Sequence, residues 1–403
     1  MSLPIHISLP RSKSIVIRCL IVHYLKTGTL LPVFENDPND IQIVYNALKT
    51  IDLQKKNRVG EECIIDIQDC GAAYRFLMPL LATTPGTWLL RGTPRLLQRP
   101  ILPLVIFLNE HGADIEKTDL GWRIEGEELQ INDFDVDTAE TSQYVSALLM
   151  IKGEKEKGEK EKARKHEGDE IISPSNFEGV SGAAGRGSLY RNPYIKMTET
   201  IVHGRGKARL APTLSDWSAA IFWLANALLY PNAHYFLKNL HFDNLQGDAN
   251  VAKYFKKWGI HFTENEYGIE IKHVRHIKIA KQQIDVAQTP DVAMVLAVLS
   301  VCYPFELTMS GLKNLNLKES NRLDIMVNEL SKFTAIDQHS EDAITIHKRT
   351  NELPKTFHFD SYNDHRFVMA WSLFRNFGKV DIQHPECVEK SYPDFLTIIT
   401  AIN

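Results

Sequence analysis

The sequence predicts a mixed α/β (α+β) protein built from repeated units of helix and strand. Three segments share one order, in which an amphipathic helix is followed by a small residue and then by two short alternating strands around a turn. These segments are residues 104–115 with 122–131, 251–262 with 267–274, and 326–337 with 343–348. Gly112, Gly259 and Thr334 occupy the same place in each segment. Their spacing suggests a period of about 75 residues, with one copy skipped or degraded between the first two.

Length and composition favour a globular protein of two or more domains. The chain has 403 residues, of which 44% are hydrophobic, so it can bury substantial cores. The net charge is only -4, with both signs spread along the chain, which gives no case for a nucleic-acid or membrane-surface partner. The five cysteines form no CxxC pair and the histidines show no metal-ligand spacing. We therefore expect a cytoplasmic protein with reduced thiols and no metal site.

Two segments differ from this pattern. Residues 152–170 form a low-complexity run of mixed charge, which predicts a disordered or solvated excursion. Glycines cluster in residues 181–188, but no strand leads into them and no apolar helix follows, so a flexible linker is favoured over a phosphate loop. The N-terminus has no signal-peptide pattern, and the apolar runs are shorter than the roughly 20 residues of a membrane span.

Cations gather near the starts of helices that are apolar on nearly every side. Helix N-termini present unpaired N–H groups and a partial positive charge, so they attract phosphate and carboxylate groups, and added cations strengthen that attraction. A guanidinium inside an apolar helix is costly unless an anion meets it. The cations are Lys13, Arg18, Arg75, Arg322 and Arg366. Together they predict a site for small, multiply anionic molecules.

Ordinary helix capping is the alternative explanation for the polar residues at these helix starts. It accounts for Ser12, Asp216, Thr289 and Asn363 one at a time without any ligand. Capping does not require the cations, because cations oppose the helix dipole at that end. The cations taken together therefore favour an anion site.

A series of segments, taken in order, resembles one family over nearly the whole chain. The segments are LPRSKSIVIRCL, GAAYRFL, LLQRPILPLV, TSQYVSALLM, NPYIKMT, LQGDANVA, TPDVAMVLAVLS, NLNLKESNRLDIM, YNDHRFVMA and CVEKSYPDF. They resemble the 3-phosphoshikimate 1-carboxyvinyltransferase (5-enolpyruvylshikimate-3-phosphate synthase) family of enolpyruvyl transferases, of which the chain looks like a divergent member. An ordered set of matches is far more specific than any single motif.

The resemblance implies a two-domain enolpyruvyl transferase fold built from repeated βαβαββ units. Residues 1–11 and 214–403 would form one discontinuous domain with three repeats. Residues 12–213 would form the second domain, with the low-complexity insert near 152–170 and one repeat truncated between Tyr194 and Asp216. The implied reaction transfers the enolpyruvyl group of phosphoenolpyruvate to the 5-hydroxyl of shikimate 3-phosphate in the shikimate pathway of aromatic amino-acid (chorismate) biosynthesis, by a monomer with no cofactor.

Site residues follow from the same resemblance. The implied catalytic residues are Lys13, Asp291 and Glu319. The implied shikimate 3-phosphate positions are Ser14, Arg18, Thr141, Ser142, Tyr194, Asp291, Asn314 and Lys318. The implied phosphoenolpyruvate positions are Lys13, Gly71, Arg99, Gln143, Arg322, His365, Arg366 and Lys390. Without the family match, Asp291 would be read as a first-turn acid that suits the helix dipole, and Glu319 as an ion-pair partner of Arg322.

The chain also departs from the family pattern at several positions. The departures are Arg11 for Gly, Ile17 for Asn, Asp69 for Asn, Ala72 for Thr and Arg191 for Ser. Asp69 places a carboxylate where anionic phosphoenolpyruvate is expected, so repulsion should weaken binding. Arg191 adds a cation near the expected 3-phosphate.

Two other functions stay open at this stage. The sister family transfers enolpyruvyl to a UDP-amino sugar (UDP-N-acetylglucosamine) and carries a Cys just upstream of its Arg-Pro pair, whereas Leu96, Leu97 and Gln98 precede Arg99-Pro100 here. A non-catalytic anion-binding protein would keep the site without turnover.

Overall fold

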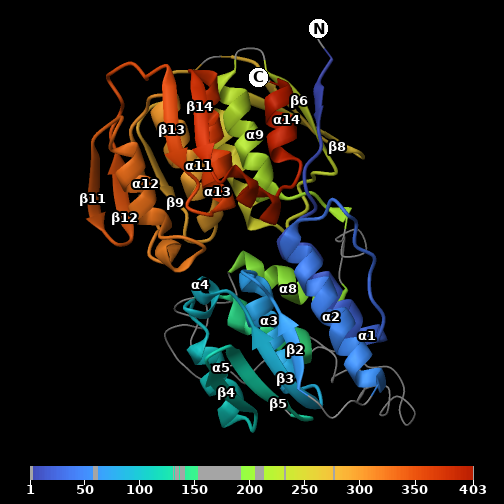
Figure 1. Ribbon diagram of the computed structural model, residues 1–403. Helices are drawn as coiled ribbons and strands as arrows, with labels where there is room; N and C mark the ends of the chain where they lie inside the picture. Colours follow the sequence, from blue (N-terminus) through green and yellow to red (C-terminus); the bar gives the residue numbers. More distant parts are fainter. Residues whose placement is uncertain are drawn as a thin grey trace, which may run out of the picture. The chain divides into compact units, whose positions relative to one another are not determined.

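The computed structural model describes residues 3–57, 62–129, 131, 136, 141–152, 192–204, 213–230, 233–275 and 277–402. The chain divides into two compact units (Figure 1). Unit 1 comprises Met1–Lys13, Phe34–Asn39 and Thr213–Asn403, and unit 2 comprises Ser14–Val33 and Asp40–Pro212. The predicted boundaries place Phe34–Asn39 in the second domain, whereas in the structure these residues belong to unit 1. Residues 153–170 of the predicted insert, the glycines of 181–188, and Arg191 lie outside the described residues.

Three four-stranded sheets share one topology. Unit 2 holds β2 (Cys63–Asp66), β3 (Gly86–Arg91), β4 (Asp114–Thr118) and β5 (Gly121–Gly126), in the order β2-β3-β5-β4. Unit 1 holds β1 (Ile5–Ile7), β6 (His234–Lys238), β7 (Ile260–Asn265) and β8 (Gly268–His273), in the order β1-β6-β8-β7, and β9 (Gln282–Asp285), β10 (Leu307–Ser310), β11 (Ile336–Ser340) and β12 (Ala343–Ile346), in the order β9-β10-β12-β11. In each sheet the first pair is parallel and the remaining pairs are antiparallel.

The three predicted helix and hairpin segments are confirmed as parts of these sheets. Their helices are α5 (Leu102–Glu110), α10 (Ala252–Lys257) and α12 (Arg322–Leu330), which precede β4-β5, β7-β8 and β11-β12. Gly112 and Gly259 have φ values of 94° and 108°, a region that favours glycine, and a Cβ on Gly259 would lie 2.3 Å from the Arg275 carbonyl oxygen. The third segment ends differently, because the Thr334 amide donates to the Leu330 carbonyl at 3.2 Å.

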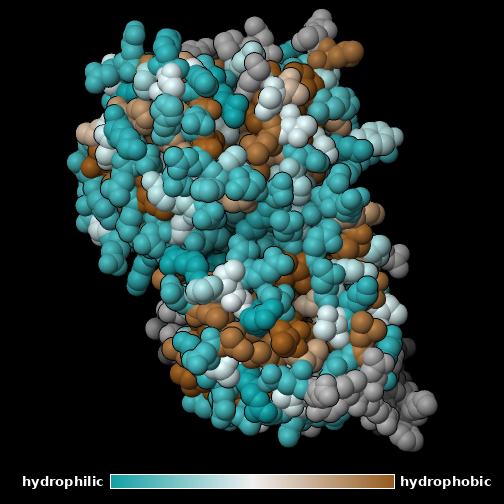
Figure 2. All heavy atoms as spheres, in the orientation of Figure 1, coloured by the Kyte–Doolittle hydropathy of each residue, from teal (hydrophilic) through white to brown (hydrophobic). Residues whose placement is uncertain are grey.

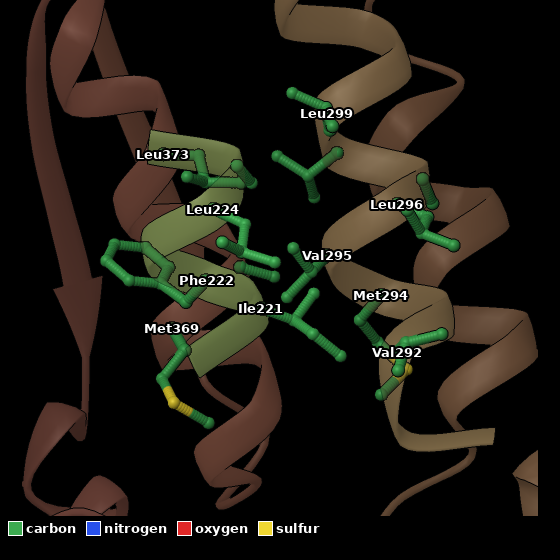
Figure 3. Close-up of a cluster of buried hydrophobic side chains, with 14 of the residues drawn as sticks. Ile221, Phe222, Leu224, Val292, Met294, Val295, Leu296, Leu299, Met369 and Leu373 are labelled. Carbon is green, nitrogen blue, oxygen red and sulfur yellow. The ribbon is translucent and has the colours of Figure 1, made fainter. Parts of the chain in front are cut away.

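The core of unit 1 is built around α9 (Trp217–Leu229), α11 (Ala293–Cys302) and α13 (His365–Trp371). Every residue of α11 and α13 is buried, as expected for helices that are apolar on nearly every side, and in α13 the buried residues include His365 and Arg366. Figure 3 shows Ile221 and Leu224 of α9 pointing towards Val295 of α11. Buried packing of this kind fixes the N-terminal turns of these helices, which carry the candidate site residues.

The remaining elements complete the two units. In unit 1 they are η3 (Gly247–Val251), η4 (Pro290–Val292), η5 (Leu315–Leu317), β13 (Thr356–Asp360), η6 (Ser372–Asn376), β14 (Lys379–Gln383), η7 (Pro385–Lys390) and α14 (Phe395–Ile402). In unit 2 they are α1 (Lys13–Thr27, whose first residue belongs to unit 1), α2 (Asn39–Asn57, likewise), α3 (Gly71–Ala82), α4 (Pro94–Leu97) and α8 (Pro193–His203), and residues 143–152 are also helical.

The surface is mixed in character. On the face shown in Figure 2, hydrophilic residues predominate and hydrophobic residues are interspersed among them. Within the part of the chain that the structure describes, no helix has the length and apolar character needed to cross a membrane.

Candidate active site

Arg322 is the centre of a buried charge cluster in unit 1. It is the first residue of α12 and is 1% exposed. Its Nε donates to Asp364 Oδ2 at 2.7 Å, its Nη1 to Asp291 Oδ1 at 2.9 Å and its Nη2 to Glu319 Oε2 at 2.8 Å. Burial alone would lower the pKa of Arg322, but these three carboxylates raise it above its ordinary value. The guanidinium is therefore permanently charged and held in one orientation.

Asp291 bridges two arginines. Besides its contact with Arg322, it accepts a hydrogen bond at 3.1 Å from Arg366 Nη2 through its second oxygen. Burial raises the pKa of Asp291, but Arg366, Arg322 and Lys318 outweigh burial and hold it well below the usual range. Asp291 is thus an ionised carboxylate whose basicity depends on how strongly the two arginines are engaged elsewhere.

Two lysines and a histidine belong to the same unit. The Lys390 Nζ lies 4.0 Å from Glu319 Oε1, and the Lys13 Nζ donates to Ser391 Oγ at 2.8 Å. His365 is 2% exposed, and burial, followed by the charges of Lys13 and Arg366, lowers its pKa well below the ordinary value. The histidine is therefore neutral at pH 7, able both to donate and to accept a hydrogen bond.

The predicted helix caps are correct only in part. Asp216 caps α9, because its Oδ1 accepts from the Ser218 amide at 2.7 Å. Thr289 occupies the predicted N-cap position, followed by Pro290, but the element it begins is a 3-10 turn ahead of α11 and its side chain makes no capping bond. The cap of α13 is Asp364 and not Asn363, since Asp364 Oδ1 accepts from the Arg366 amide at 3.0 Å.

Sequence reasoning also missed two buried carboxylates in unit 1 that interact with the predicted site residues. Asp364 holds Arg322 and is fully buried. Asp248 is 7% exposed in η3, and its Oδ1 meets no hydrogen-bond donor among the described residues. Burial, followed by the charge of Asp291, raises the pKa of Asp248 to about 8. Both residues lie inside segments that carry the family resemblance, YNDHRFVMA and LQGDANVA, and this was the one signal that could have revealed them.

Unit 2 contains a second group, arranged around Arg18. Arg18 is 2% exposed, and burial lowers its pKa to about 10, so it stays charged at neutral pH. Arg18 Nε donates to Thr198 Oγ1 at 2.7 Å and Nη1 to the Ser14 carbonyl at 2.8 Å. Nη2 lies 3.4 Å from Ser146 Oγ, one turn beyond the predicted pair of Thr141 and Ser142.

A third group, also in unit 2, lies around Arg75 and α3. Arg75 Nη1 donates to the Gly71 carbonyl at 3.3 Å and to Gln143 Oε1 at 3.1 Å, and Nη2 donates to the Pro100 carbonyl at 3.1 Å. Arg99 packs against Gly71, where an added Cβ would lie 2.6 Å from Arg99 Nη1. The structure thus brings together the positions predicted for phosphoenolpyruvate in unit 2, and Arg75 joins them.

The other predicted residues lie beside these groups. Asn314 and Lys318 flank η5 in unit 1, and the charge of Lys318 acts on both Asp248 and Asp291. In unit 2, Tyr194 lies in the first turn of α8, which Asn192 caps, and Thr141 Oγ1 accepts from the Gln143 amide at 3.2 Å. Among the described residues, no group of His, Cys, Asp and Glu side chains is arranged to hold a metal ion.

Comparisons with known proteins identify the family. The profile of EPSP synthase (3-phosphoshikimate 1-carboxyvinyltransferase) matches residues 39–172 and 192–399. The chain belongs to the EPSP synthase family. A relative from Bacteroides fragilis, named 3-phosphoshikimate 1-carboxyvinyltransferase, is 31% identical across 96% of this chain and 93% of its own length. One from Photobacterium damsela subsp. piscicida, with the same name, is 26% identical across 97% and 95%.

Solved structures agree on the fold. EPSP synthase from Acinetobacter baumannii matches with a TM-score of 0.62 and 17% identity, over 98% of this chain and 95% of that one. The enolpyruvyl transferase NikO from Streptomyces tendae matches with a TM-score of 0.60 and 12% identity, over 100% and 94%. The expected two-domain enolpyruvyl transferase fold is therefore confirmed.

One departure from the EPSP synthase family pattern has a clear structural role in unit 1. Arg11, where the family pattern has Gly, donates through Nε to Asp37 Oδ1 at 2.6 Å and stacks over Phe34 at 4.7 Å. The Asp37 carboxylate also accepts from the Phe34 amide at 2.7 Å. Because Asp37 is buried, this pair holds the segment Phe34–Asn39 against the residues that precede Lys13.

Proposed function

We propose that the protein transfers the enolpyruvyl group of phosphoenolpyruvate to the 5-hydroxyl of shikimate 3-phosphate and releases inorganic phosphate, within aromatic amino-acid biosynthesis. The observation that carries this proposal is the position of Asp291 between Arg322 and Arg366, with Glu319 on the same guanidinium as Asp291. The cations suit a carboxylate and a phosphate, and the two carboxylates suit proton transfer. Membership of the EPSP synthase family supports the same reaction.

The reaction needs a base and an acid in each of two steps. In the first, the 5-hydroxyl oxygen attacks C2 of phosphoenolpyruvate and loses its proton, while the C3 methylene gains a proton. In the second, the tetrahedral intermediate loses a proton from C3 and phosphate from C2, which restores the double bond. We assign the hydroxyl proton to Asp291, the C3 proton to Glu319, and hydrogen bonding to the hydroxyl and phosphate to Lys13.

Substrate binding would change the basicity of Asp291. In the ligand-free protein, Arg322 and Arg366 hold the pKa of this carboxylate well below its usual range. A substrate carboxylate or phosphate bound to these arginines, with Lys390 and His365 beside it, would share their hydrogens and weaken their hold on Asp291. The pKa of Asp291 would rise, which makes it a better proton acceptor only when substrate is present.

In unit 2, the two groups would receive different parts of the substrates. We assign Ser14, Arg18, Thr141, Ser142 and Tyr194, together with Asp291, Asn314 and Lys318 of unit 1, to shikimate 3-phosphate. Gly71, Arg99 and Gln143 are assigned to phosphoenolpyruvate, together with Lys13, Arg322, His365, Arg366 and Lys390 of unit 1. The hydrogen bonds support this division, because Arg18 bonds to Ser14 of the first set, whereas Arg75 bonds to Gly71 and Gln143 of the second.

Phosphate release with purified protein tests the function. We expect inorganic phosphate only when phosphoenolpyruvate and shikimate 3-phosphate are both present, and none when UDP-N-acetylglucosamine replaces the shikimate partner. Lys13→Met should abolish release, whereas Lys253→Met, which changes an exposed lysine on α10, should not. Release no greater than that of Lys13→Met would refute the enzymatic function, and calorimetric binding of shikimate 3-phosphate without product would then favour an anion-binding protein.

We also propose that the protein is a cytoplasmic monomer with domains at 1–11 plus 214–403 and at 12–213. The free cysteines support a cytoplasmic location, and the mixed surface supports a monomer. Light scattering of the purified protein would test the monomer, and limited proteolysis between residues 204 and 214 would test the second boundary.

A further inference from the structure

Arg18 is a buried cation whose protein partners are neutral. It lies 2% exposed in α1, and its guanidinium packs 4.8 Å from the centre of the Phe76 ring. No ion pair joins it to a carboxylate in the part of the chain that the structure describes, and its hydrogen bonds go to hydroxyl and carbonyl oxygens. A guanidinium in such surroundings can turn unless each of these bonds holds it.

Thr198 supplies the shortest of these bonds. Its side chain is fully buried on α8, and its Oγ1 accepts from Arg18 Nε at 2.7 Å. The same hydroxyl donates its own hydrogen to the Tyr194 carbonyl at 2.9 Å. Because a hydroxyl carries one hydrogen, this donation fixes Oγ1 as the acceptor for Arg18. Thr198 therefore ties Arg18 on α1 to Tyr194 on α8.

The bonds also determine which hydrogens of Arg18 can meet a ligand. Nε has a single hydrogen, and Thr198 takes it. Nη1 and Nη2 carry two hydrogens each, and their bonds to Ser14 and Ser146 account for one on each nitrogen. Each Nη therefore keeps a second hydrogen, and a planar guanidinium can donate such hydrogens to two oxygen atoms of one phosphate.

We propose that Thr198 is a positioning residue for shikimate 3-phosphate, because its hydroxyl sets the rotation of the Arg18 guanidinium and links it to Tyr194. This inference rests on the proposed function. Thr198 does not touch the substrate, and its effect passes through Arg18. Removal of the hydroxyl should weaken substrate binding and leave the chemical step unchanged.

Thr198→Val tests the proposal, because valine keeps the shape of threonine and removes only the hydroxyl. We expect the KM for shikimate 3-phosphate to rise about tenfold with kcat unchanged, since a bond to a charged group is lost and Nε is left buried. Thr84→Val is the matched control. Thr84 is also buried in unit 2 and donates to a helix carbonyl, that of Leu80, at 2.7 Å, but its hydroxyl accepts no bond from an arginine among the described residues.

Two further measurements separate positioning from simple loss of structure. Thr198→Ser keeps the hydroxyl and should restore the KM to near the value of the unmodified protein. NMR of the Arg18 Nε–H should show a slowly exchanging signal that Thr198→Val removes and Thr198→Ser retains. Equal KM values for the Val variant and the unmodified protein, or an equal rise in the Ser and Val variants, would overturn the proposal.

The same experiments distinguish this inference from the proposed function. If the unmodified protein releases no phosphate, the proposed function fails, and the Nε–H signal still decides whether Thr198 holds Arg18. If the unmodified protein is active and the Nε–H signal does not respond to Thr198→Val, the positioning role fails and the proposed function stands.

Discussion

Asp364 holds Arg322 through two hydrogen bonds, one from Nε to Oδ2 at 2.7 Å and one from Nη2 to Oδ1 at 3.2 Å. Both side chains are buried, at 0% and 1% exposure. Asp364 Oδ2 also accepts from Ser320 Oγ at 2.9 Å, so the carboxylate fixes both sides of the turn into α12. With one edge of Arg322 engaged by Asp364, the other edge faces Asp291 and Glu319. Asp364 thus supports the candidate site without occupying it.

This arrangement predicts that Asp364→Asn is strongly destabilising. The amide keeps the size of the side chain but leaves the buried Arg322 with less compensating charge. Loss of one partner of a buried ion pair typically costs about 3–5 kcal/mol. We expect the free energy of unfolding, measured by urea denaturation, to fall by roughly that amount.

Glu319→Gln is the matched comparison on the same guanidinium. Glu319 is more exposed, at 14%, and Arg322 would retain Asp364 and Asp291. The loss of stability should therefore be smaller than for Asp364→Asn. If Glu319 transfers the C3 proton, kcat should fall by roughly 10²–10⁴-fold while the protein remains folded. Equal destabilisation by the two variants would contradict this division of roles.

Gly71→Ala is predicted to disturb Arg99. A Cβ at this position would lie 2.6 Å from Arg99 Nη1 and 2.9 Å from Cζ, so the guanidinium must move. Because the arginine can swing away, the fold should survive and the KM for phosphoenolpyruvate should rise about tenfold. A double-mutant cycle provides the control: in an Arg99→Ala background, Gly71→Ala should add little. An equal effect in both backgrounds would show that Arg99 is not the cause.

The repeated hairpins could be predicted from the sequence, because each depends on local periodicity. Between Val251 and Val274, apolar residues recur first at helical spacing and then at alternate positions, and the structure has α10, β7 and β8 there. The Gly259 turn was visible for the same reason, since a left-handed residue after a helix favours glycine. Local patterns of this kind need no knowledge of which segments meet in space.

Contacts between distant segments could not be predicted in this way. Asp291, Arg322 and Arg366 lie on separate helical turns. The cations at helix starts grouped the two arginines, but only the family resemblance placed Asp291 with them. Thr198 carries no local signal, because many threonines in helices donate to the carbonyl one turn back, as Thr198 does to Tyr194, and nothing in the local sequence shows that it also accepts from Arg18. The cap at Asn363 was misplaced by one residue, since Asn and Asp are both good caps and only the backbone of the turn decides between them.

Asp248 predicts a pH dependence of stability. Its folded pKa of about 8 exceeds the model-compound value of 3.8, so between these pH values the folded state binds more protons than the unfolded state. The free energy of unfolding should therefore fall as pH rises from about 4 to 8, with a limiting slope of about 1.4 kcal/mol per pH unit for one proton. Asp248→Asn should remove this contribution, which urea denaturation at pH 5 and pH 7.5 would measure. If the unmodified and Asn proteins lose stability in parallel, Asp248 is ionised throughout the range.

Asp69→Asn is predicted to tighten phosphoenolpyruvate binding. Asp69 is exposed and lies two residues before Gly71, whose neighbour Arg99 is assigned to that anion. Repulsion between exposed charges is modest and screened by salt, so the KM for phosphoenolpyruvate should fall about two- to threefold at low ionic strength and less at high. Asp66→Asn is the control, because Asp66 is also exposed, lies farther from Gly71 along the chain and is paired with Arg91 at 2.7 Å, so its removal should leave that KM unchanged. If Asp69→Asn leaves the KM unchanged at low ionic strength, its carboxylate does not act on the bound anion.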